Sequence, residues 1–150
     1  MKLNLHNNVL LAACVVVLAV LCFLSVDGPL NFEREREQRE KVVKAQLDKI
    51  VRAEQRYRQL KGVYTGSFDV LTAVGLLDKA DRYVPYSEGR SFELEATTEV
   101  GKSGRTIPQL TCGVRYAVYL QGLDEDKVNE LSAHAAAMGS YPGIQVTEGK

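Results

Sequence analysis

The sequence of 150 residues contains no tryptophan, two histidines and three cysteines. Three cysteines are too few for a disulfide-framed scaffold or a cysteine-rich metal cluster. Because 19 basic and 19 acidic side chains cancel, the chain also lacks the positive excess with which most nucleic-acid-binding proteins attract phosphates, and we expect no nucleic-acid partner. With 45% hydrophobic and 25% charged residues, the composition is typical of a folded chain, and the length suits one domain of ordinary size.

What the sequence does have is one long apolar run. Residues 9–26 read VLLAACVVVLAVLCFLSV and contain no charged side chain. A helix of this length spans about 27 Å, close to the ~30 Å hydrocarbon core of a bilayer. The run ends at Asp27-Gly28-Pro29, where a charge, a flexible residue and a helix breaker coincide. The sequence therefore predicts a short leader over 1–8 and a transmembrane helix over 9–26, with the lipid bilayer as its partner.

Two alternatives for this run are weaker. A cleaved signal peptide has an apolar stretch of roughly 7–15 residues before a small-residue cleavage site, whereas this run is longer and Leu24-Ser25-Val26 offers no such site. The segment Leu11-Ala12-Ala13-Cys14 matches a lipoprotein signal. A lipidated cysteine should follow a full apolar region and precede a polar chain, but Cys14 lies inside the apolar run. We attribute this match to chance.

The orientation of the anchor depends on the charges that flank it. The leader carries one lysine, while five basic residues follow the run within twenty residues of its end: Arg34, Arg36, Arg39, Lys41 and Lys44. Counted alone, these charges would hold the C-terminal part in the cytoplasm. An N-terminal anchor with a tiny basic leader usually exports the bulk of its chain, however, and large domains translocate with little regard to charge. We expect an inner (cytoplasmic) membrane protein with a periplasmic C-terminal domain.

After the apolar run, the sequence predicts a stalk helix over residues 27–62. Asn31 suits the N-cap position, and Glu33 would lie in the first turn, where the helix dipole favours a negative charge. Two pairs of opposite charge support the helix by about 0.2–0.5 kcal/mol each: Glu35–Arg39 and Glu37–Lys41. We expect this charged part to be solvated. The alternative is a zipper to a partner of complementary charge or to lipid headgroups.

An apolar stripe continues along the same helix. It consists of Val43, Leu47, Ile50 and Tyr57 at heptad spacing, widened by Val51 and Leu60. The seam is interrupted at Glu54 and is shorter than the three or four heptads that a coiled coil needs. A stripe this wide is typical of a helix that packs on the protein's own sheet. Lys61-Gly62 indicates the helix end, with glycine as the C-terminal cap.

A motif follows at residues 53–71, which read AEQRYRQLKGVYTGSFDVL. Together with the preceding helices, it resembles type IV pilins and pseudopilins, whose long helix ends in a similar Ala-x-Gln-x-x-Tyr, Gly-x-Tyr, Leu arrangement. The resemblance covers about the first half of the chain and implies a pilin-like architecture. The pilin processing site, a glycine before a Phe-rich segment with a glutamate shortly after, does not occur between Met1 and Val20, so no functional residue is carried over. The whole chain also resembles short single-anchor bacterial envelope proteins of unassigned function.

The remaining residues, 63–150, are predicted to form a small α+β domain with a mostly antiparallel sheet. Alternating apolar and polar residues predict a strand over 92–100, and the glycine-rich segment 101–104 supplies a turn. A second alternating run predicts a paired strand over 110–120 that bends near Gly113.

Two further helices and a last strand complete the predicted domain. A short helix lies between residues 64 and 85, with Asp69 as its cap. A longer helix begins at Asp124, where Leu123 can pack on Val128 as a hydrophobic staple. Its buried stripe and its end are formed by Val128, Leu131, Ala135, Met138 and Gly139. Residues 144–147 form the last strand after a turn.

Phosphate-binding and metal-binding patterns are incomplete. Gly101-Lys102-Ser103 matches the end of a phosphate-binding loop, but the motif needs glycine where this chain has Ala96, and the context is strand–turn–strand. A metal site needs several convergent ligands, whereas His6 and His134 are far apart in the sequence and have no ligand partner at helical spacing. We expect His134 at the surface, and we assign no cofactor-binding or metal-binding residue.

The remaining reactive and polar residues also have ordinary structural interpretations. Cys112 lies on the apolar side of its strand, where a buried, inert thiol is expected; catalysis would need an activating histidine or a cationic pocket, and an intermolecular disulfide would need exposure. Cys14 and Cys22 should face lipid or a partner helix. Three glutamates should form the solvated face of the sheet rather than bind a cation or a basic partner: Glu93, Glu95 and Glu99. The seven tyrosines have no spacing that gathers them into one binding surface.

These observations favour a structural or interaction protein over an enzyme. We expect a single-pass, membrane-anchored protein of the bacterial cell envelope, with no catalytic residue, whose stalk or domain contacts partner proteins or a second copy of itself. The alternative, implied by the resemblance, is a pilin-like or pseudopilin-like subunit of a secretion or pilus system.

Overall fold

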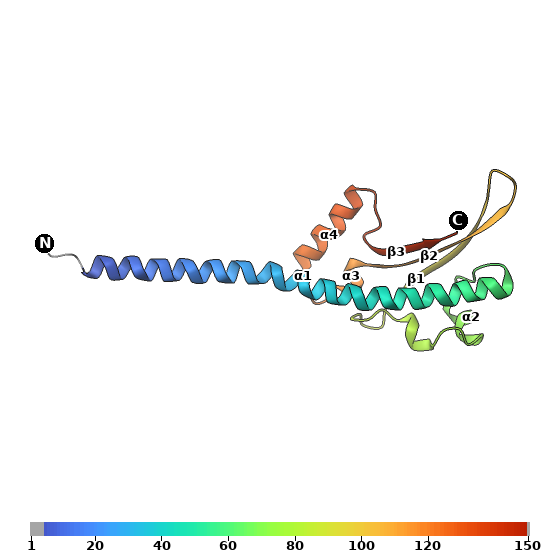
Figure 1. Cartoon of the computed structure of the whole chain (residues 1–150), viewed down its shortest axis with the longest axis horizontal. Helices are drawn as coiled ribbons and strands as arrows, with labels where there is room; N and C mark the ends of the chain where they lie inside the picture. Colours follow the sequence, from blue (N-terminus) through green and yellow to red (C-terminus); the bar gives the residue numbers. More distant parts are fainter. Residues whose placement is uncertain (1–4, 150) are drawn as a thin grey trace. The chain divides into compact units, whose positions relative to one another are not determined.

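The computed structural model describes the backbone of residues 5–149 and the side chains of residues 8–25 and 30–149. The fold is α+β, as predicted: a long helix precedes short helices and a small antiparallel sheet (Figure 1). The elements in chain order are α1 Leu5–Lys61, α2 Phe68–Ala73, the 3-10 helix η1 Lys79–Arg82, β1 Glu93–Val100, β2 Thr106–Arg115, α3 Tyr116–Tyr119, α4 Glu125–Ala137 and β3 Gly143–Glu148. The chain forms two compact units, Met1–Glu37 and Gln38–Lys150.

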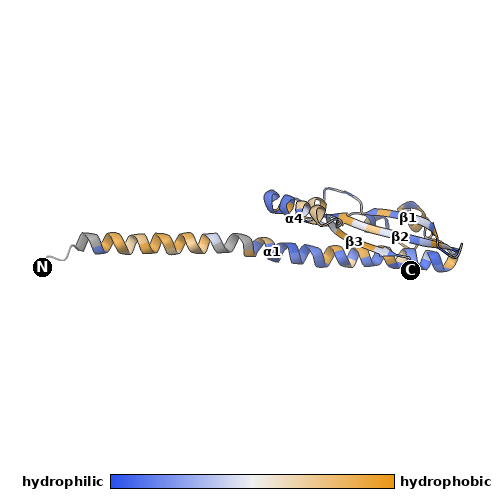
Figure 2. Ribbon diagram, turned by 90° about the horizontal axis from the view of Figure 1, so that it is seen from above, coloured by the Kyte–Doolittle hydropathy of each residue, from blue (hydrophilic) through white to orange (hydrophobic). Residues whose placement is uncertain are grey.

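The first unit contains the apolar part of α1, which is orange in Figure 2. The most apolar window of 18 residues has a mean hydropathy of 3.1, and none of it is buried. By length and composition, α1 is the one helix among the described residues that could cross a membrane.

The helix break predicted at residues 27–29 is wrong, and so is the N-cap predicted at Asn31. The backbone is helical through both positions. Ending a helix and starting another leaves four carbonyl groups and four N–H groups without intrahelical partners, whereas continuing past one proline costs one hydrogen bond and a steric clash with one carbonyl group. The end predicted at Lys61-Gly62 is confirmed: the Gly62 N–H donates to the Arg58 carbonyl over 2.7 Å.

The second unit is built around a sheet with the strand order β1-β2-β3, in which both pairs are antiparallel. Leu94, Cys112 and Val146 lie in one row across the three strands, and Glu93, Gly113 and Gln145 lie in the next. Since neighbouring residues on a strand point to opposite faces, the first row belongs to the apolar face and the second to the polar one. The strand predicted over 92–100 and the last strand are confirmed.

The second half of α1 supplies the core of this unit. In Figure 1 it runs between the sheet and the α2–η1 segment. The prediction that its apolar stripe packs within the protein is confirmed, because Val43, Leu47 and Ile50 are at most 1% exposed. Leu60, which was predicted to widen the stripe, is 66% exposed, because it lies in the last turn of the helix.

The strand predicted over 110–120 ends earlier, at Arg115. Residues 116–119 form the short helix α3 instead. The reason is that Tyr119 and the adjacent Leu120 are both buried, and a strand would have placed one of these neighbours on the solvent side. The Tyr119 hydroxyl donates to Glu40 over 3.2 Å, which ties α3 to α1 within this unit.

Helix α4 begins as predicted but is much less buried. The Asp124 side chain accepts hydrogen bonds from the backbone N–H groups of Asp126 and Lys127, which confirms the cap. Of the predicted stripe, only Val128 is buried, and Met138 is 70% exposed. α4 packs on α3, which has only four residues and supports only the start of α4. The N-cap of α2 predicted at Asp69 is wrong as well. Ser67 occupies the N-cap position, and Asp69 lies in the first turn of the helix.

Candidate interaction groove on α1

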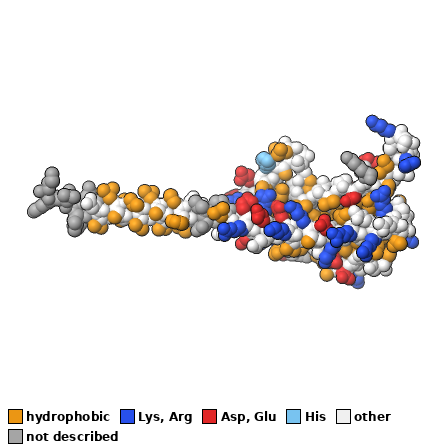
Figure 3. Space-filling model, viewed as in Figure 1, with side chains coloured by type: hydrophobic (Ala, Val, Ile, Leu, Met, Phe, Trp, Pro, Cys, Tyr) orange, Lys and Arg blue, Asp and Glu red, His pale blue; other side chains and the backbone are white. Residues whose placement is uncertain are grey.

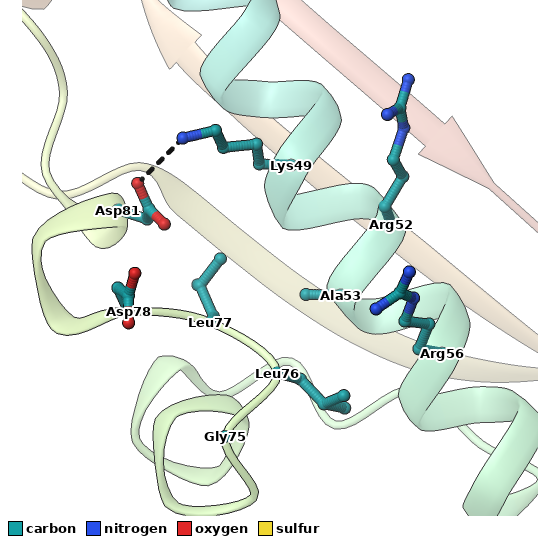
Figure 4. A pocket seen from close by; sticks show the side chains of 9 residues that line it. All are labelled: Lys49, Arg52, Ala53, Arg56, Gly75, Leu76, Leu77, Asp78 and Asp81. Carbon is teal, nitrogen blue, oxygen red and sulfur yellow. Dashed lines mark ion pairs between the residues drawn. The ribbon is translucent and has the colours of Figure 1, made fainter.

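A groove lies between α1 and the segment that joins α2 to η1, entirely within the second unit. Lys49, Arg52 and Arg56 line it on the α1 side, and residues 75–78 with Asp81 line the other side. We call it the α1 groove; its volume is about 280 Å³ (Figure 4). The three basic residues share one face of the helix because they are three and four positions apart.

The floor of the α1 groove is apolar. The segment after α2 turns back toward α1 because the Gly75 N–H donates to the Thr72 carbonyl and the Leu76 N–H donates to the Leu71 carbonyl, both over 3.0 Å. This turn places Leu77 against α1, where it is buried, as is Ala53 on the opposite side of the groove.

The charges around the α1 groove are only partly compensated. Lys49 Nζ lies 3.5 Å from Asp81 Oδ1, and the same carboxylate oxygen accepts a hydrogen bond from Gln46 over 2.7 Å. Arg52 and Arg56 are exposed and form neither a hydrogen bond nor an ion pair with any residue that the structure describes. In Figure 4, Arg56 bends back toward Ala53, whereas Arg52 points away from the loop. The groove can therefore offer positive charge above an apolar floor to an anionic group.

Glu54, which the sequence shows only as an interruption of the stripe, is fully buried. Its two carboxylate oxygens accept hydrogen bonds from the backbone N–H groups of Thr65 and Gly66, each over 2.9 Å. Burial raises the pKa of Glu54 above its ordinary value, and the two hydrogen bonds partly oppose that shift. We call this arrangement the Glu54 clasp. The sequence does carry a signal for the Glu54 clasp: a glutamate lies inside an apolar stripe, and a loop that contains glycine follows the helix.

Cys112 is buried, as predicted. Burial, and next the charge of Glu54, raise the pKa of its thiol to about 12. A thiol with such a pKa stays protonated at neutral pH and is therefore a poor nucleophile. Cys14 and Cys22 are free cysteines with exposed side chains in the apolar part of α1.

The glutamates of β1 are exposed and are partly engaged by neighbours on the sheet. Glu93 accepts hydrogen bonds from Arg115 over 3.0 Å and from the Tyr141 hydroxyl over 2.8 Å. Burial and the adjacent Glu93 raise the pKa of Tyr141. Glu99 accepts a hydrogen bond from Gln109 over 2.7 Å. These contacts engage the carboxylates of Glu93 and Glu99 within the sheet.

The other residues singled out in the sequence do not converge. Residues 101–103 form the turn between β1 and β2, so they are not at a helix N-terminus as a phosphate-binding loop would be. His134 is exposed on α4, as predicted, and the side chain of His6 lies outside the described residues. The described residues contain no group of three or more His, Cys, Asp or Glu residues that could hold a metal ion.

The tyrosines are also dispersed. Tyr116 and Tyr119 have ring centroids 6.1 Å apart, whereas Tyr86 lies under Arg39 and Tyr64 under Arg58. On the face shown in Figure 3, basic and acidic side chains are interspersed over the second unit.

In comparisons with known proteins, no family model, curated protein or solved structure matches the chain.

Proposed function

We propose that this chain is a single-pass, membrane-anchored interaction protein of the bacterial cell envelope. Residues 9–26 would span the inner membrane, and the unit Gln38–Lys150 would bind other proteins in the periplasm. The observation that carries the proposal is the exposed apolar part of α1. Eleven large apolar side chains between Val9 and Leu24 are 50–74% exposed.

Water is an unfavourable environment for that surface. Burying a Val, Leu or Phe side chain contributes about 1.5–3 kcal/mol, so this segment would gain well over 10 kcal/mol by entering an apolar phase. Continuous apolar surfaces of this kind mark membrane or protein contacts. A helix that satisfies its own backbone hydrogen bonds is one of the few structures that a bilayer admits.

The interaction role is supported by what the second unit offers. The α1 groove supplies charge above an apolar floor, and α4 leaves part of its predicted apolar stripe exposed. Cys112, the one cysteine of this unit, is buried, and burial raises the pKa of its thiol. The periplasmic assignment depends on the short leader and on the tendency of large domains to be exported.

The first experiment concerns topology. Alkaline phosphatase and, separately, a fluorescent protein that matures only in the cytoplasm would be fused after Lys150. We expect phosphatase activity without fluorescence and recovery of both fusions in the inner-membrane fraction. A matched chain with Val16→Arg and Leu18→Arg should no longer be retained in the membrane. Fluorescence without phosphatase activity would place the domain in the cytoplasm and reject the periplasmic part of the proposal.

The second experiment concerns partners. The full chain and a chain whose residues 38–150 are replaced by an unrelated folded domain would be compared after cross-linking in cells. We expect specific cross-linked complexes only with the full chain. If every complex persists with the replacement, the unit Gln38–Lys150 is not the interaction module.

A pilin-like subunit is the second candidate. One observation favours it: the second half of α1 packs along an antiparallel sheet and ends in the 53–71 motif. This candidate requires N-terminal trimming before assembly into a fibre. Mass spectrometry of the purified protein would test it, because an intact Met1, or removal of that methionine alone, contradicts pilin-type processing.

A further inference from the structure

We infer that the α1 groove binds an acidic segment of a partner protein, with Arg56 contacting one carboxylate over the apolar floor and Arg52 contacting a second carboxylate on the exposed face of α1 one turn away. The inference rests on the proposed function, because it names the surface and the chemistry by which the unit Gln38–Lys150 would recognise a partner.

The charge balance of the groove is the first argument. Lys49, Arg52 and Arg56 lie within about two turns of one helix, and like charges three or four residues apart on a helix repel each other. Asp81 compensates Lys49. Asp78 also lines the groove, and Asp48 precedes Arg52 by one helical turn, but within the described part of the chain neither carboxylate forms an ion pair with Arg52 or Arg56. Two other arginines of α1 do have partners: Arg39 donates to the carbonyls of Tyr119 and Gln121, and Arg58 donates to Tyr64. An incoming anion would relieve the repulsion between Arg52 and Arg56.

The second argument is the shape of the groove. The guanidinium group presents a planar fork of N–H donors that matches a carboxylate with two parallel hydrogen bonds. Arg56 bends toward the buried Ala53 (Figure 4), so a carboxylate bound there would place its methylene groups over the apolar floor. The volume of about 280 Å³ accommodates side chains of this size.

A protein segment suits the groove better than a free phosphate does. The two arginines are one helical turn apart, about 5–6 Å between their Cβ atoms, which matches two glutamates four residues apart on a partner helix. The apolar floor rewards the methylene groups of glutamate, which phosphate lacks. Asp78 and Asp81 line the opposite side, and a phosphate would concentrate its charge near them, whereas two glutamates on a helix spread theirs along the two arginines.

The test uses the full chain in lipid nanodiscs and a fluorescent helical peptide with glutamates four residues apart. A peptide with glutamine in place of each glutamate is the control ligand. We expect fluorescence anisotropy to show binding of the acidic peptide alone, with an affinity that falls as salt rises. Charge reversal with Arg52→Glu and Arg56→Glu should weaken binding at least about tenfold.

The matched protein control carries Lys102→Glu and Arg105→Glu in the exposed turn between β1 and β2, which changes the net charge equally. It should bind like the wild type. A second variant with Arg52→Gln and Arg56→Gln keeps the inference testable if charge reversal disturbs folding, which thermal unfolding would reveal. Equal binding of the two peptides, or equal weakening by both charge-reversed pairs, would overturn the inference.

Two further outcomes separate this inference from others. Inorganic phosphate, added alone, should not displace the peptide at concentrations that leave the ionic strength unchanged; displacement would make the groove a phosphate site and reject the inference. In cells, the Arg52→Glu and Arg56→Glu chain should lose its cross-linked complexes. If those complexes persist while replacement of residues 38–150 abolishes them, the domain still binds partners but does so through another surface.

Discussion

Glu54 is the single charged residue that lies buried among the residues whose side chains the structure describes. Accepting two backbone hydrogen bonds, from Thr65 and Gly66, offsets part of the cost of burying its carboxylate. Those two donors depend on it equally, because a buried N–H group without an acceptor loses its hydration and gains nothing in return. The clasp thus fixes the loop after α1 through one side chain.

Replacing Glu54 with alanine should destabilise the protein strongly. The change leaves two N–H groups unpaired and opens a cavity, so we expect a loss of about 2–4 kcal/mol in the free energy of unfolding. Urea denaturation followed by circular dichroism would measure it. Asp48→Ala on an exposed position of the same helix should change stability by no more than about 0.5 kcal/mol. Similar effects of the two substitutions would contradict a role for the clasp.

The clasp also makes stability depend on pH. Burial holds the pKa of Glu54 in the folded state above its ordinary value of 4.5, so the folded state binds this proton more tightly than the unfolded state does. The favourable contribution is complete below pH 4.5 and is lost as pH rises through the raised pKa, by at most about 1.4 kcal/mol per pH unit. Urea titrations between pH 4 and 8 should show this loss relative to Glu54→Gln, and parallel curves would refute it.

Cys112 should be almost unreactive while the protein is folded. In a chain with Cys14→Ala and Cys22→Ala, a pKa of about 12 for the remaining thiol leaves about a thousandfold less thiolate at pH 8 than an ordinary cysteine has. Labelling with iodoacetamide, followed by mass spectrometry, should be slow in buffer and fast in urea. Rapid labelling of the folded protein would show that the thiol is accessible.

At the scale of the elements, the loop between α1 and α2 is fixed by a close contact with the sheet. Gly66 has a φ of 61°, and a Cβ atom there would lie 2.7 Å from the backbone nitrogen of Ala96 on β1. That nitrogen belongs to the backbone and cannot move aside as a flexible side chain could. Only glycine therefore lets this loop approach β1 so closely.

Substitution of Gly66 with alanine should cost more stability than the same change at Gly62. Both residues have a left-handed φ, but a Cβ at Gly62 would meet nothing within 4 Å. We expect a loss of about 1 kcal/mol for Gly62→Ala from backbone strain alone, and at least 2–3 kcal/mol, in rough terms, for Gly66→Ala from strain and overlap together. Thermal unfolding of both variants would measure the two losses of stability. Equal losses would contradict the close contact between Gly66 and β1.

Element types were predictable where one local rule dominated. The alternation in 92–100 and the Asp124 cap each depend on neighbouring residues, and both predictions are confirmed. The end of β2 was not predictable, because alternation continues past Arg115 and only the joint burial of Tyr119 and Leu120 favours α3. The continuous helix through residues 27–29 was not predicted either. The helix breakers in this segment are a local signal, whereas the hydrogen bonds of the long helical segments on both sides favour continuation.

At the scale of the whole molecule, the α1 groove could not be predicted from periodicity. Its two sides come from residues 49–56 and 75–81, and the second segment has an irregular loop without a repeating pattern. The Glu54 clasp likewise joins a helix to a loop that is eleven and twelve residues away. Contacts between segments that are apart in the sequence show in single unusual residues, such as a glutamate in an apolar stripe, and not in the composition of either segment.

The second unit should fold without the apolar segment but not without the end of α1. A chain starting at Gln38 keeps Val43, Leu47 and Ile50 in the core, whereas a chain starting at Val63 loses them. Three such side chains contribute about 5–9 kcal/mol, comparable with the whole net stability of a small domain. Circular dichroism and urea titration should show a cooperative transition for the longer chain only; cooperative unfolding of the shorter chain would contradict this prediction.

The place of α1 in the core has a consequence for proteolysis. A protease that cuts between Val43 and Arg58 would separate the sheet from the residues that bury its apolar face. Such a cut would not release a working fragment; it would start the degradation of the whole unit. Only cleavage before Gln38 would leave the second unit intact, so a protease that separates this unit from the apolar run can act only on the stretch between that run and Gln38.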